Sequence, residues 1–301
     1  MGPVFALIVA NVIWGAAPPI FKFAYENIPP FTLGLLRFTL ATLILFPFVA
    51  RAKMPIISAR QWLTLVSGAF LIGVHLMLFF LGLEKTESIN TSIISSVGPI
   101  ILYFASIKFL HERRNGSVFV GMCVALAGSL TVIVSPLFLG NQAFGLGQFE
   151  GNLLILASTI TDIFAILLLK KSMKRLSPLF VTLVMFALTA LFFYPLALYE
   201  LQTWSLSQLD YRGVIGIVFG ALLSSTLAYY LHDYGISKMK AEEVGIFTYI
   251  APIITIIVAV PLLGEIPNEY FYLGGALVII GILIARHKLH WHALHELKRQ
   301  K

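Results

Sequence analysis

Long apolar stretches separated by short polar breaks run along the whole chain. Runs near the length of about 20 residues that a helix needs to cross hydrocarbon fall at 4–25, 31–50, 61–83, 88–110 and 115–136. A second set falls at 150–170, 178–199, 211–235, 242–263 and 268–286. Prolines and glycines that end helices separate them, as at Pro29, Pro178 and Gly264. The pattern predicts an all-α membrane protein with ten transmembrane helices.

The same pattern of residues recurs half a chain later. At a spacing of 153 positions, residues of the first half align with identical residues of the second, among them Gly82, Lys85, Pro99, Glu112, Gly121 and Gly128 with Gly235, Lys238, Pro252, Glu265, Gly274 and Gly281. Five spans per repeat is an odd number, so the second repeat must cross the membrane in the opposite sense. We therefore predict a 5+5 inverted repeat, a geometry that supports alternating access to one central site.

The distribution of basic residues predicts the orientation. With the N-terminus in the cytoplasm, 16 of the 21 Lys and Arg residues lie on the inner side and three, Lys22, Lys85 and Arg212, on the outer side. Cytoplasmic loops of membrane proteins carry such an excess, so both termini are expected to be cytoplasmic. The predicted organisation is a first repeat at 1–138, an outer linker at 139–149, a second repeat at 150–286 and a basic tail at 287–301 that lies on lipid.

Composition narrows the function classes. Hydrophobic residues make up 58% of the chain, charged residues 12%, and the mean hydropathy is +0.90, values that exclude a soluble domain. The net charge of +7 comes from the connections and the tail, so we expect no nucleic-acid partner. The single cysteine, Cys123, excludes an intrachain disulfide. The four tail histidines lack acidic or Cys companions at a metal-binding spacing, so we expect no metal.

Two prolines lie in corresponding apolar runs of the two repeats. Pro99 and Pro252 are expected to bend their helices and free a backbone carbonyl. Freed backbone at membrane depth must face protein or a water-filled cavity. Matching interrupted spans are a sequence pointer to a transport site, although a simple packing kink is the alternative.

Three of the ionisable residues inside apolar runs, where a charge is costly, are candidates for the transport site. Asp162 is a candidate to bind a substrate amine or take up a coupling proton, or it is a structural carboxylate. Arg37 either binds a substrate carboxylate, or extends outward to the membrane surface or caps carbonyls of another helix. Asp162 and Arg37 could also pair with each other. His75 is a candidate for proton coupling or a hydrogen-bonded packing residue.

Further polar and aromatic residues are predicted near the central site. Trp14 aligns with Asp162 at a spacing of 148, so the two are expected to face the cavity from opposite repeats. The remaining candidates are Asn11, Phe79, Ser95, Tyr229 and Tyr249, with helix packing as the alternative for each.

Two pairs of charged residues are expected to have structural roles. His232 and Asp233 are expected at a solvated inner helix end, with an inner gate as the alternative. Glu112 and Glu265 are each expected to cap the next helix along the chain.

These residues resemble a known family. The ordered pairs Pro99/Pro252, Glu112/Glu265, Gly121/Gly274 and Gly128/Gly281, with Trp14-Gly15 and Arg37, resemble the ten-helix EamA-type branch of the drug/metabolite transporter superfamily from about residue 5 to 286. The resemblance implies a secondary carrier, often an exporter of amino acids or related small metabolites. It also implies a cavity lined mainly by spans 1, 3, 4, 6, 8 and 9.

The expected function is therefore secondary export of a small metabolite across a bacterial or archaeal plasma membrane. We expect the protein to bind its small-molecule substrate and membrane lipid, and to be a monomer or a homodimer. We expect no cofactor, with protons as a candidate coupling ion. An exporter of cationic or aromatic drugs is the alternative, followed by a channel or a membrane-embedded enzyme. The chain has no HExxH, GxSxG or P-loop motif, so we expect no enzymatic activity.

Overall fold

The computed structural model describes residues 2–51, 57–98, 101, 116–138, 142–239, 245–281 and 283–284, and all regular structure in these ranges is helical. Seven described helices are long and apolar enough to cross a membrane. They are α1 (Pro3–Tyr25), α2 (Pro30–Ala50), α3 (Ala59–Lys85), α6 (Gly116–Val134), α7 (Gln142–Met173), α8 (Pro178–Glu200) and the continuous segment Tyr211–Lys238. The chain is therefore a multi-pass integral membrane protein.

Shorter helices complete the described chain. The segment Tyr211–Lys238 consists of α9 (Tyr211–Val218), the π-helix η3 (Phe219–Leu227) and α10 (Ala228–Lys238). The other short elements are α4 (Ser88–Ser95), η1 (Ser135–Leu137), η2 (Leu206–Gln208), η4 (Gly245–Ile250), α12 (Ala251–Leu263) and a last helix at Glu269–Gly281.

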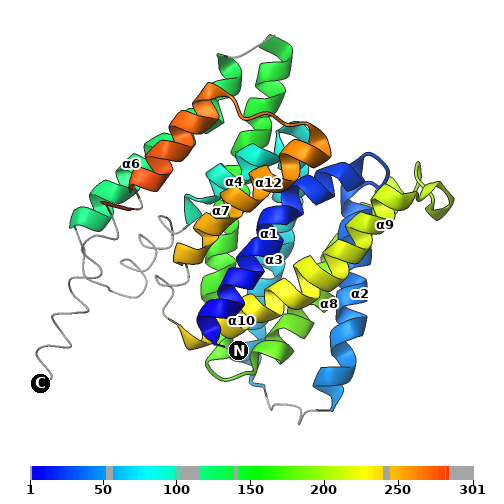
Figure 1. Ribbon diagram of the computed structural model, residues 1–301. Helices are drawn as coiled ribbons and strands as arrows, with labels where there is room; N and C mark the ends of the chain where they lie inside the picture. Colours follow the sequence, from blue (N-terminus) through cyan, green and yellow to red (C-terminus); the bar gives the residue numbers. More distant parts are fainter. Residues whose placement is uncertain are drawn as a thin grey trace, which may run out of the picture.

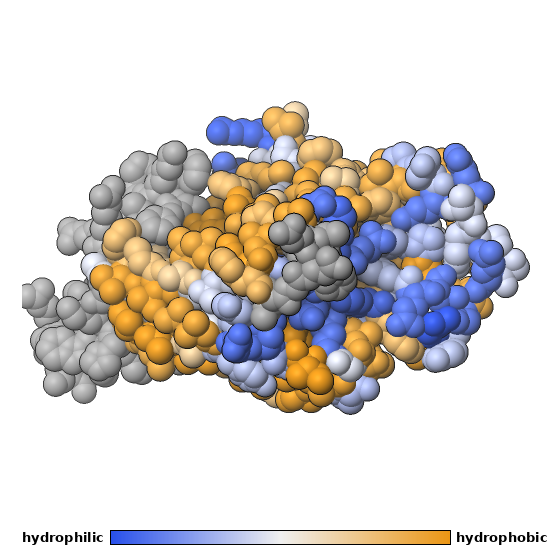
Figure 2. All heavy atoms as spheres, turned by 90° about the horizontal axis from the view of Figure 1, so that it is seen from above, coloured by the Kyte–Doolittle hydropathy of each residue, from blue (hydrophilic) through white to orange (hydrophobic). Residues whose placement is uncertain are grey.

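The outer faces of the helices are apolar. Leu43, Leu63 and Ile257 are each more than half exposed, at 62%, 68% and 61%, a pattern that suits contact with lipid tails rather than water. Seen from above, hydrophilic residues gather over one end of the molecule and hydrophobic residues cover much of its flanks (Figure 2). This distribution is the one expected of a bundle that spans a bilayer.

Helices of the two halves pack against each other in corresponding pairs (Figure 1). Helix α3 packs on α7, and α1 packs on the α9–η3–α10 segment; these two contacts exchange when the repeats are exchanged. The contacts of α1 with α12 and of α7 with α4 are related in the same way, while α2 with α8 and α4 with α12 each map onto themselves. The packing thus has the symmetry of the sequence repeat.

Repeat glycines form the contact between α6 and the last helix. A Cβ atom on Gly274 would lie 2.6 Å from the carbonyl oxygen of Gly128, and one on Gly281 would collide with the carbonyl oxygen of Gly121. The two helices therefore touch backbone to backbone, as small residues allow in membranes. Because the lower-numbered glycine of one helix meets the higher-numbered glycine of the other, the helices cross antiparallel.

An aromatic core joins α2, α3 and α8. The rings of Phe38 and Phe193 stack with an interplanar angle of 3° and centroids 6.3 Å apart, and Phe80 stacks on Phe193 at 5.5 Å. Phe186 completes the group, 5.5 Å from Phe38. This core fixes the face of α2 that carries Arg37.

Some sequence expectations differ from the structure or lie outside it. Helix α7 already begins at Gln142, so residues 142–149 are helical where the sequence predicted a linker. The division into two repeats and a tail otherwise stays a prediction. Pro99, Glu112, the side chain of Tyr249 and the tail lie outside the described residues.

Candidate functional site

A cavity of about 230 Å³ lies between the two halves of the bundle. Its walls come from both repeats: α1, α2, α3 and α4 on one side, and α7, α8, η3, α10, η4 and α12 on the other. A volume of this size suits a small molecule. Eight of the nine residues expected to bind substrate line it, namely Asn11, Trp14, Arg37, His75, Phe79, Ser95, Asp162 and Tyr229.

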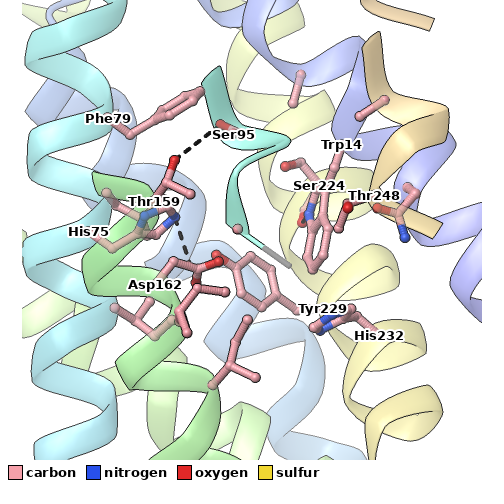
Figure 3. A pocket seen from close by; sticks show the side chains of 18 of the residues that line it. Trp14, His75, Phe79, Ser95, Thr159, Asp162, Ser224, Tyr229, His232 and Thr248 are labelled. Carbon is pink, nitrogen blue, oxygen red and sulfur yellow. Dashed lines mark hydrogen bonds and ion pairs between the residues drawn. The ribbon is translucent and has the colours of Figure 1, made fainter. Parts of the chain in front are cut away.

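His75 and Asp162 face each other across the cavity, from α3 and α7 (Figure 3). Imidazole Nε2 lies 4.0 Å from carboxylate Oδ1, and Nδ1 lies 2.8 Å from the hydroxyl and 3.0 Å from the carbonyl oxygen of Ser158. In the tautomer with the proton on Nδ1, that nitrogen donates to the Ser158 carbonyl and Nε2 is left to face the carboxylate. Protonation of Nε2 would then create an ion pair inside the cavity.

Trp14 lies in the middle of α1 and not at an interface. Its indole Nε1 donates to the carbonyl oxygen of Ser224 at 3.0 Å, and its ring lies edge-on to Tyr229 at 5.0 Å and 4.8 Å from the ring of His232. As its alignment with Asp162 predicted, the two side chains line one cavity from different repeats (Figure 3). The indole and phenol give this wall an amphipathic surface.

Two further hydrogen bonds involve residues that line the cavity. Thr159 Oγ1 donates to Ser95 Oγ at 3.4 Å, which joins α7 to α4 beside Phe79 (Figure 3). Asn11 Nδ2 donates to the Leu7 carbonyl at 2.8 Å and therefore keeps its amide oxygen for another partner.

Arg37 is buried and does not pair with Asp162. Its Nε donates to Ser225 Oγ at 3.1 Å, and its guanidinium carbon lies 4.6 Å from the ring centroid of Phe21 and 4.5 Å from that of Phe38. Only 2% of the Arg37 surface is exposed, so the side chain does not extend to the membrane surface. Arg37 and Asp162 thus occupy separate parts of the cavity.

The expectation that His232 and Asp233 mark a solvated helix end was wrong. They are 6% and 3% exposed and line the cavity. Asp233 accepts a 2.5 Å hydrogen bond from Thr182 Oγ1 of α8, which holds the carboxylate against the neighbouring helix. Packing of α10 on α8 buries this end of the helix, and hydropathy alone does not reveal that packing.

Both central spans with a repeat proline are interrupted at the cavity. Helix α4 ends at Ser95 with a turn at 96–97, four residues before Pro99. The matching span in the other half runs as the 3₁₀ helix η4 up to Ile250 and becomes α12 at Ala251, with Pro252 in its first turn. Pro252 therefore starts a helix, where its missing N–H costs nothing, and does not bend a continuous one.

The π-helix η3 was not predicted from the sequence. It spans nine residues, Phe219–Leu227, and presents the Ser224 carbonyl to Trp14 and the Ser225 hydroxyl to Arg37. Such wide turns occur frequently at functional sites. The paired serines in an otherwise apolar run were the available signal.

Glu265 caps a helix, but not the one expected. Its carboxylate accepts hydrogen bonds from Ser88 N (2.9 Å), Ser88 Oγ (2.7 Å) and Ile89 N (3.1 Å) at the start of α4, in the other half of the chain. Lys22 Nζ lies 3.0 Å from the same carboxylate and donates to the Thr86 carbonyl at 2.6 Å. We call Lys22, Thr86, Ser88, Ile89 and Glu265 the Glu265 cluster.

Comparisons with known proteins agree with this architecture. The family described as the EamA-like transporter family matches residues 1–134 and again residues 149–286. A crystal structure with 16% sequence identity superposes with a TM-score of 0.68 and covers 94% of this chain and 96% of its own, which shows the same fold.

Several relatives are described as transporters. YetK of Bacillus subtilis, an uncharacterized transporter, is 27% identical over 94% of this chain and 86% of its own length. An uncharacterized transporter of Archaeoglobus fulgidus is 25% identical over 94% and 97%. A protein of Streptantibioticus cattleyicolor, described as a probable terminal-alkyne amino-acid exporter, is 21% identical over 93% and 92%.

Proposed function

The chain belongs to the EamA-like transporter family, so it is a membrane transporter and not an enzyme, and we propose that it exports a small metabolite such as an amino acid by alternating access. One observation carries this proposal. The cavity is enclosed by symmetry-related elements of both repeats and contains a carboxylate, an imidazole and an aromatic wall. The description of the Streptantibioticus cattleyicolor relative as a probable terminal-alkyne amino-acid exporter supports an amino-acid substrate.

We propose a topology of ten spans with both termini in the cytoplasm of a bacterial or archaeal cell. The excess of basic residues on one side supports this orientation, and the antiparallel contact of Gly128 with Gly274 supports inversion of the second repeat. The relatives from Bacillus and Archaeoglobus support a prokaryotic plasma membrane. Because the cavity lies within one chain, a monomer is sufficient for transport and dimerisation is not required.

The proposed resting state is closed on the outer side. The Glu265 cluster ties α1, α4 and the end of α12 together, and none of its residues lines the cavity. Nearby, Thr255 Oγ1 donates to the Gly15 carbonyl at 2.7 Å and holds α12 against α1. The cavity instead continues to Lys170, Asp233 and Ile236, near the proposed cytoplasmic ends of α7 and α10. Outward opening must therefore break the Glu265 cluster.

We further propose that His75 and Asp162 couple transport to protons. A proton on His75 Nε2 would pair the imidazolium with Asp162, and a substrate amine would compete with it for the same carboxylate. Substrate and proton would then exchange at one place in the cavity, which is the requirement for antiport.

Counterflow in proteoliposomes tests the function. Vesicles loaded with unlabelled L-phenylalanine or L-leucine should accumulate the labelled amino acid from outside, and the rate should saturate. A pH gradient alone should drive the same movement. Protein-free vesicles serve as the control. A flux that rises linearly with concentration and shows no counterflow would indicate a channel and contradict the proposal.

Export of cationic aromatic drugs is the second candidate. Asp162 beside the aromatic wall of Trp14 and Tyr229 favours such cations. An aromatic monoamine such as phenethylamine should then compete with L-phenylalanine in counterflow and be transported faster. Preference for the amino acid would assign the cavity to the proposed metabolite class.

A further inference from the structure

We propose that Arg37 forms an anion subsite that binds the carboxylate of the transported substrate. This inference rests on the proposed transport function and specifies its substrate class. It assigns the end of the cavity at α2 and η3 to a carboxylate, and leaves the end at Asp162 to a positively charged or hydrogen-bond-donating group.

The first support is a buried charge without a counter-ion. Arg37 is 2% exposed, and among the described residues it forms no ion pair. An uncompensated cation inside a membrane bundle is expensive. A bound anion would supply the missing charge.

The second support is the free edge of the guanidinium. The central carbon of the guanidinium lies over the rings of Phe21 and Phe38, 4.6 and 4.5 Å from their centroids. Nε is used by Ser225, while Nη1 is buried without a hydrogen-bond partner among the described residues. Carboxylates bind guanidinium groups in the plane, through paired N–H donors. The aromatic rings therefore stabilise the cation, and Nη1 is the donor that a ligand carboxylate would satisfy.

The third support is how the neighbouring helix makes room. A Cβ atom on Gly220 of η3 would lie 3.2 Å from Cβ and 3.3 Å from Cδ of Arg37. The glycine therefore lets the π-helix pass close to the arginine stem, and five residues later Ser225 receives its Nε–H. If Arg37 served only to join α2 to η3, its remaining donors should also be satisfied by protein groups, and Nη1 has no partner in the part of the chain that the structure describes.

The position of Tyr229 relates this subsite to Asp162. Tyr229 lines the same cavity as Arg37 and Asp162, and its ring centroid lies 6.5 Å from that of Phe38, the ring that packs on the guanidinium. A zwitterion placed beside the Tyr229 ring would direct its carboxylate to Arg37 and its amine to Asp162. The two groups would thus read opposite ends of one substrate, and a monoamine lacking the carboxylate would leave the buried cation unpaired.

Binding of matched acid and amide ligands to the purified protein tests the subsite. The probes are L-phenylalanine with L-phenylalaninamide and L-leucine with L-leucinamide, followed by intrinsic tryptophan fluorescence. At a pH well below the α-amino pKa of about 7.7–8.0 that an amide-flanked amine has, both members of a pair carry the same ammonium group and side chain and differ in the negative charge. The acids should bind about 10- to 100-fold more tightly than the amides, the range expected for a lost charge-assisted hydrogen bond. Equal affinities, or no binding of either acid, would overturn the proposal.

Substitutions at the arginine add a second, independent arm. Arg37→Gln should weaken binding of the acids to the level of the amides and leave the amides unchanged, while Arg37→Lys should retain part of the difference. Arg212→Gln removes a basic side chain that pairs with Glu26 and Asp210 away from the cavity and should change neither ligand. Equal weakening of acid and amide by Arg37→Gln would assign Arg37 a structural role and overturn the subsite.

The outcomes also separate this proposal from the transport function. Counterflow of amides but not of acids would leave the transporter in place and remove the anion subsite. Tight binding of acids without counterflow would keep the subsite and remove the proposed transport function. If Arg37→Gln does not yield folded protein, the comparison of acid and amide on the wild-type protein still decides.

Discussion

Glu265, at the end of the second half, accepts hydrogen bonds from the backbone N–H and the hydroxyl of Ser88, at the start of α4 in the first half. A carboxylate placed there satisfies N–H groups that the first turn of a helix leaves without partners. It also favours the positive end of the helix dipole. The Glu265 side chain therefore links the two repeats at the end of the bundle where Lys22 also lies.

Glu265→Gln should lower the free energy of unfolding by about 1–3 kcal/mol, because the ion pair with Lys22 and one acceptor for α4 are lost. Thermal unfolding in detergent measures this change. Glu26→Gln is the matched control, since Glu26 is an exposed partner of Arg212 and should have a much smaller effect. Equal effects of the two substitutions would show that the Glu265 cluster does not hold the repeats together.

Gly128→Ala should destabilise the contact between α6 and the last helix. The added Cβ would overlap the carbonyl oxygen of Gly274, and overpacking of this kind costs about 1–3 kcal/mol. The control is Gly147→Ala in α7, where a Cβ meets nothing within 4 Å. That substitution should leave stability unchanged or raise it slightly. A neutral Gly128→Ala would contradict the close backbone crossing.

Asp162→Asn should slow counterflow by about an order of magnitude or more, the loss expected when a charge-assisted contact to substrate is removed. The variant should remain folded, as judged by gel filtration and thermal unfolding. Glu150→Gln, in the N-terminal part of α7 and paired with Lys85 outside the cavity, is the control and should transport normally. Wild-type turnover of Asp162→Asn would remove this residue from the site.

Asp210 gives a pH-dependent contribution outside the membrane spans. Hydrogen bonds from the Arg212 side chain hold the pKa of this carboxyl below its usual range. A lowered pKa in the folded state contributes stability above the unfolded pKa, and this contribution is lost as the pH falls through the folded value. Asp210→Asn keeps a helix-capping oxygen but should be less stable than wild type at neutral pH. Thermal unfolding across the acid range should show the difference shrinking on acidification.

Much of the architecture was accessible from the sequence because the solvent is a bilayer. Span length and the spacing of repeat glycines are local signals, and they led to a helical membrane protein with two related halves. The cavity residues Trp14, His75 and Asp162 could also be predicted from the sequence. Polar groups in the middle of apolar spans are costly unless they face a shared interior, so their position in the chain already indicated their environment.

Features that depend on packing between distant helices could not be predicted from the sequence. Glu265 was assigned to the next helix, whereas its partner Ser88 lies 177 positions earlier. His232 and Asp233 lie in a polar stretch that resembles a helix end, and contact with α8 buries them. The paired serines of the π-helix marked a polar position in an apolar run, but they did not indicate that the helix widens there. In each case the deciding interaction is tertiary and leaves no local periodicity.

If the two halves open and close around one cavity, a covalent link between α1 and the end of α12 on the proposed outer side should stop transport. In a Cys123→Ser background, Lys22→Cys and Glu265→Cys are joined by a short, reductively cleavable bifunctional maleimide, and counterflow is measured before tethering, after tethering and after cleavage. The protein with Lys22→Cys alone receives the same reagent as control. Exchange should stop in the tethered protein and return when the linker is cut. Undiminished exchange in the tethered protein would contradict alternating access.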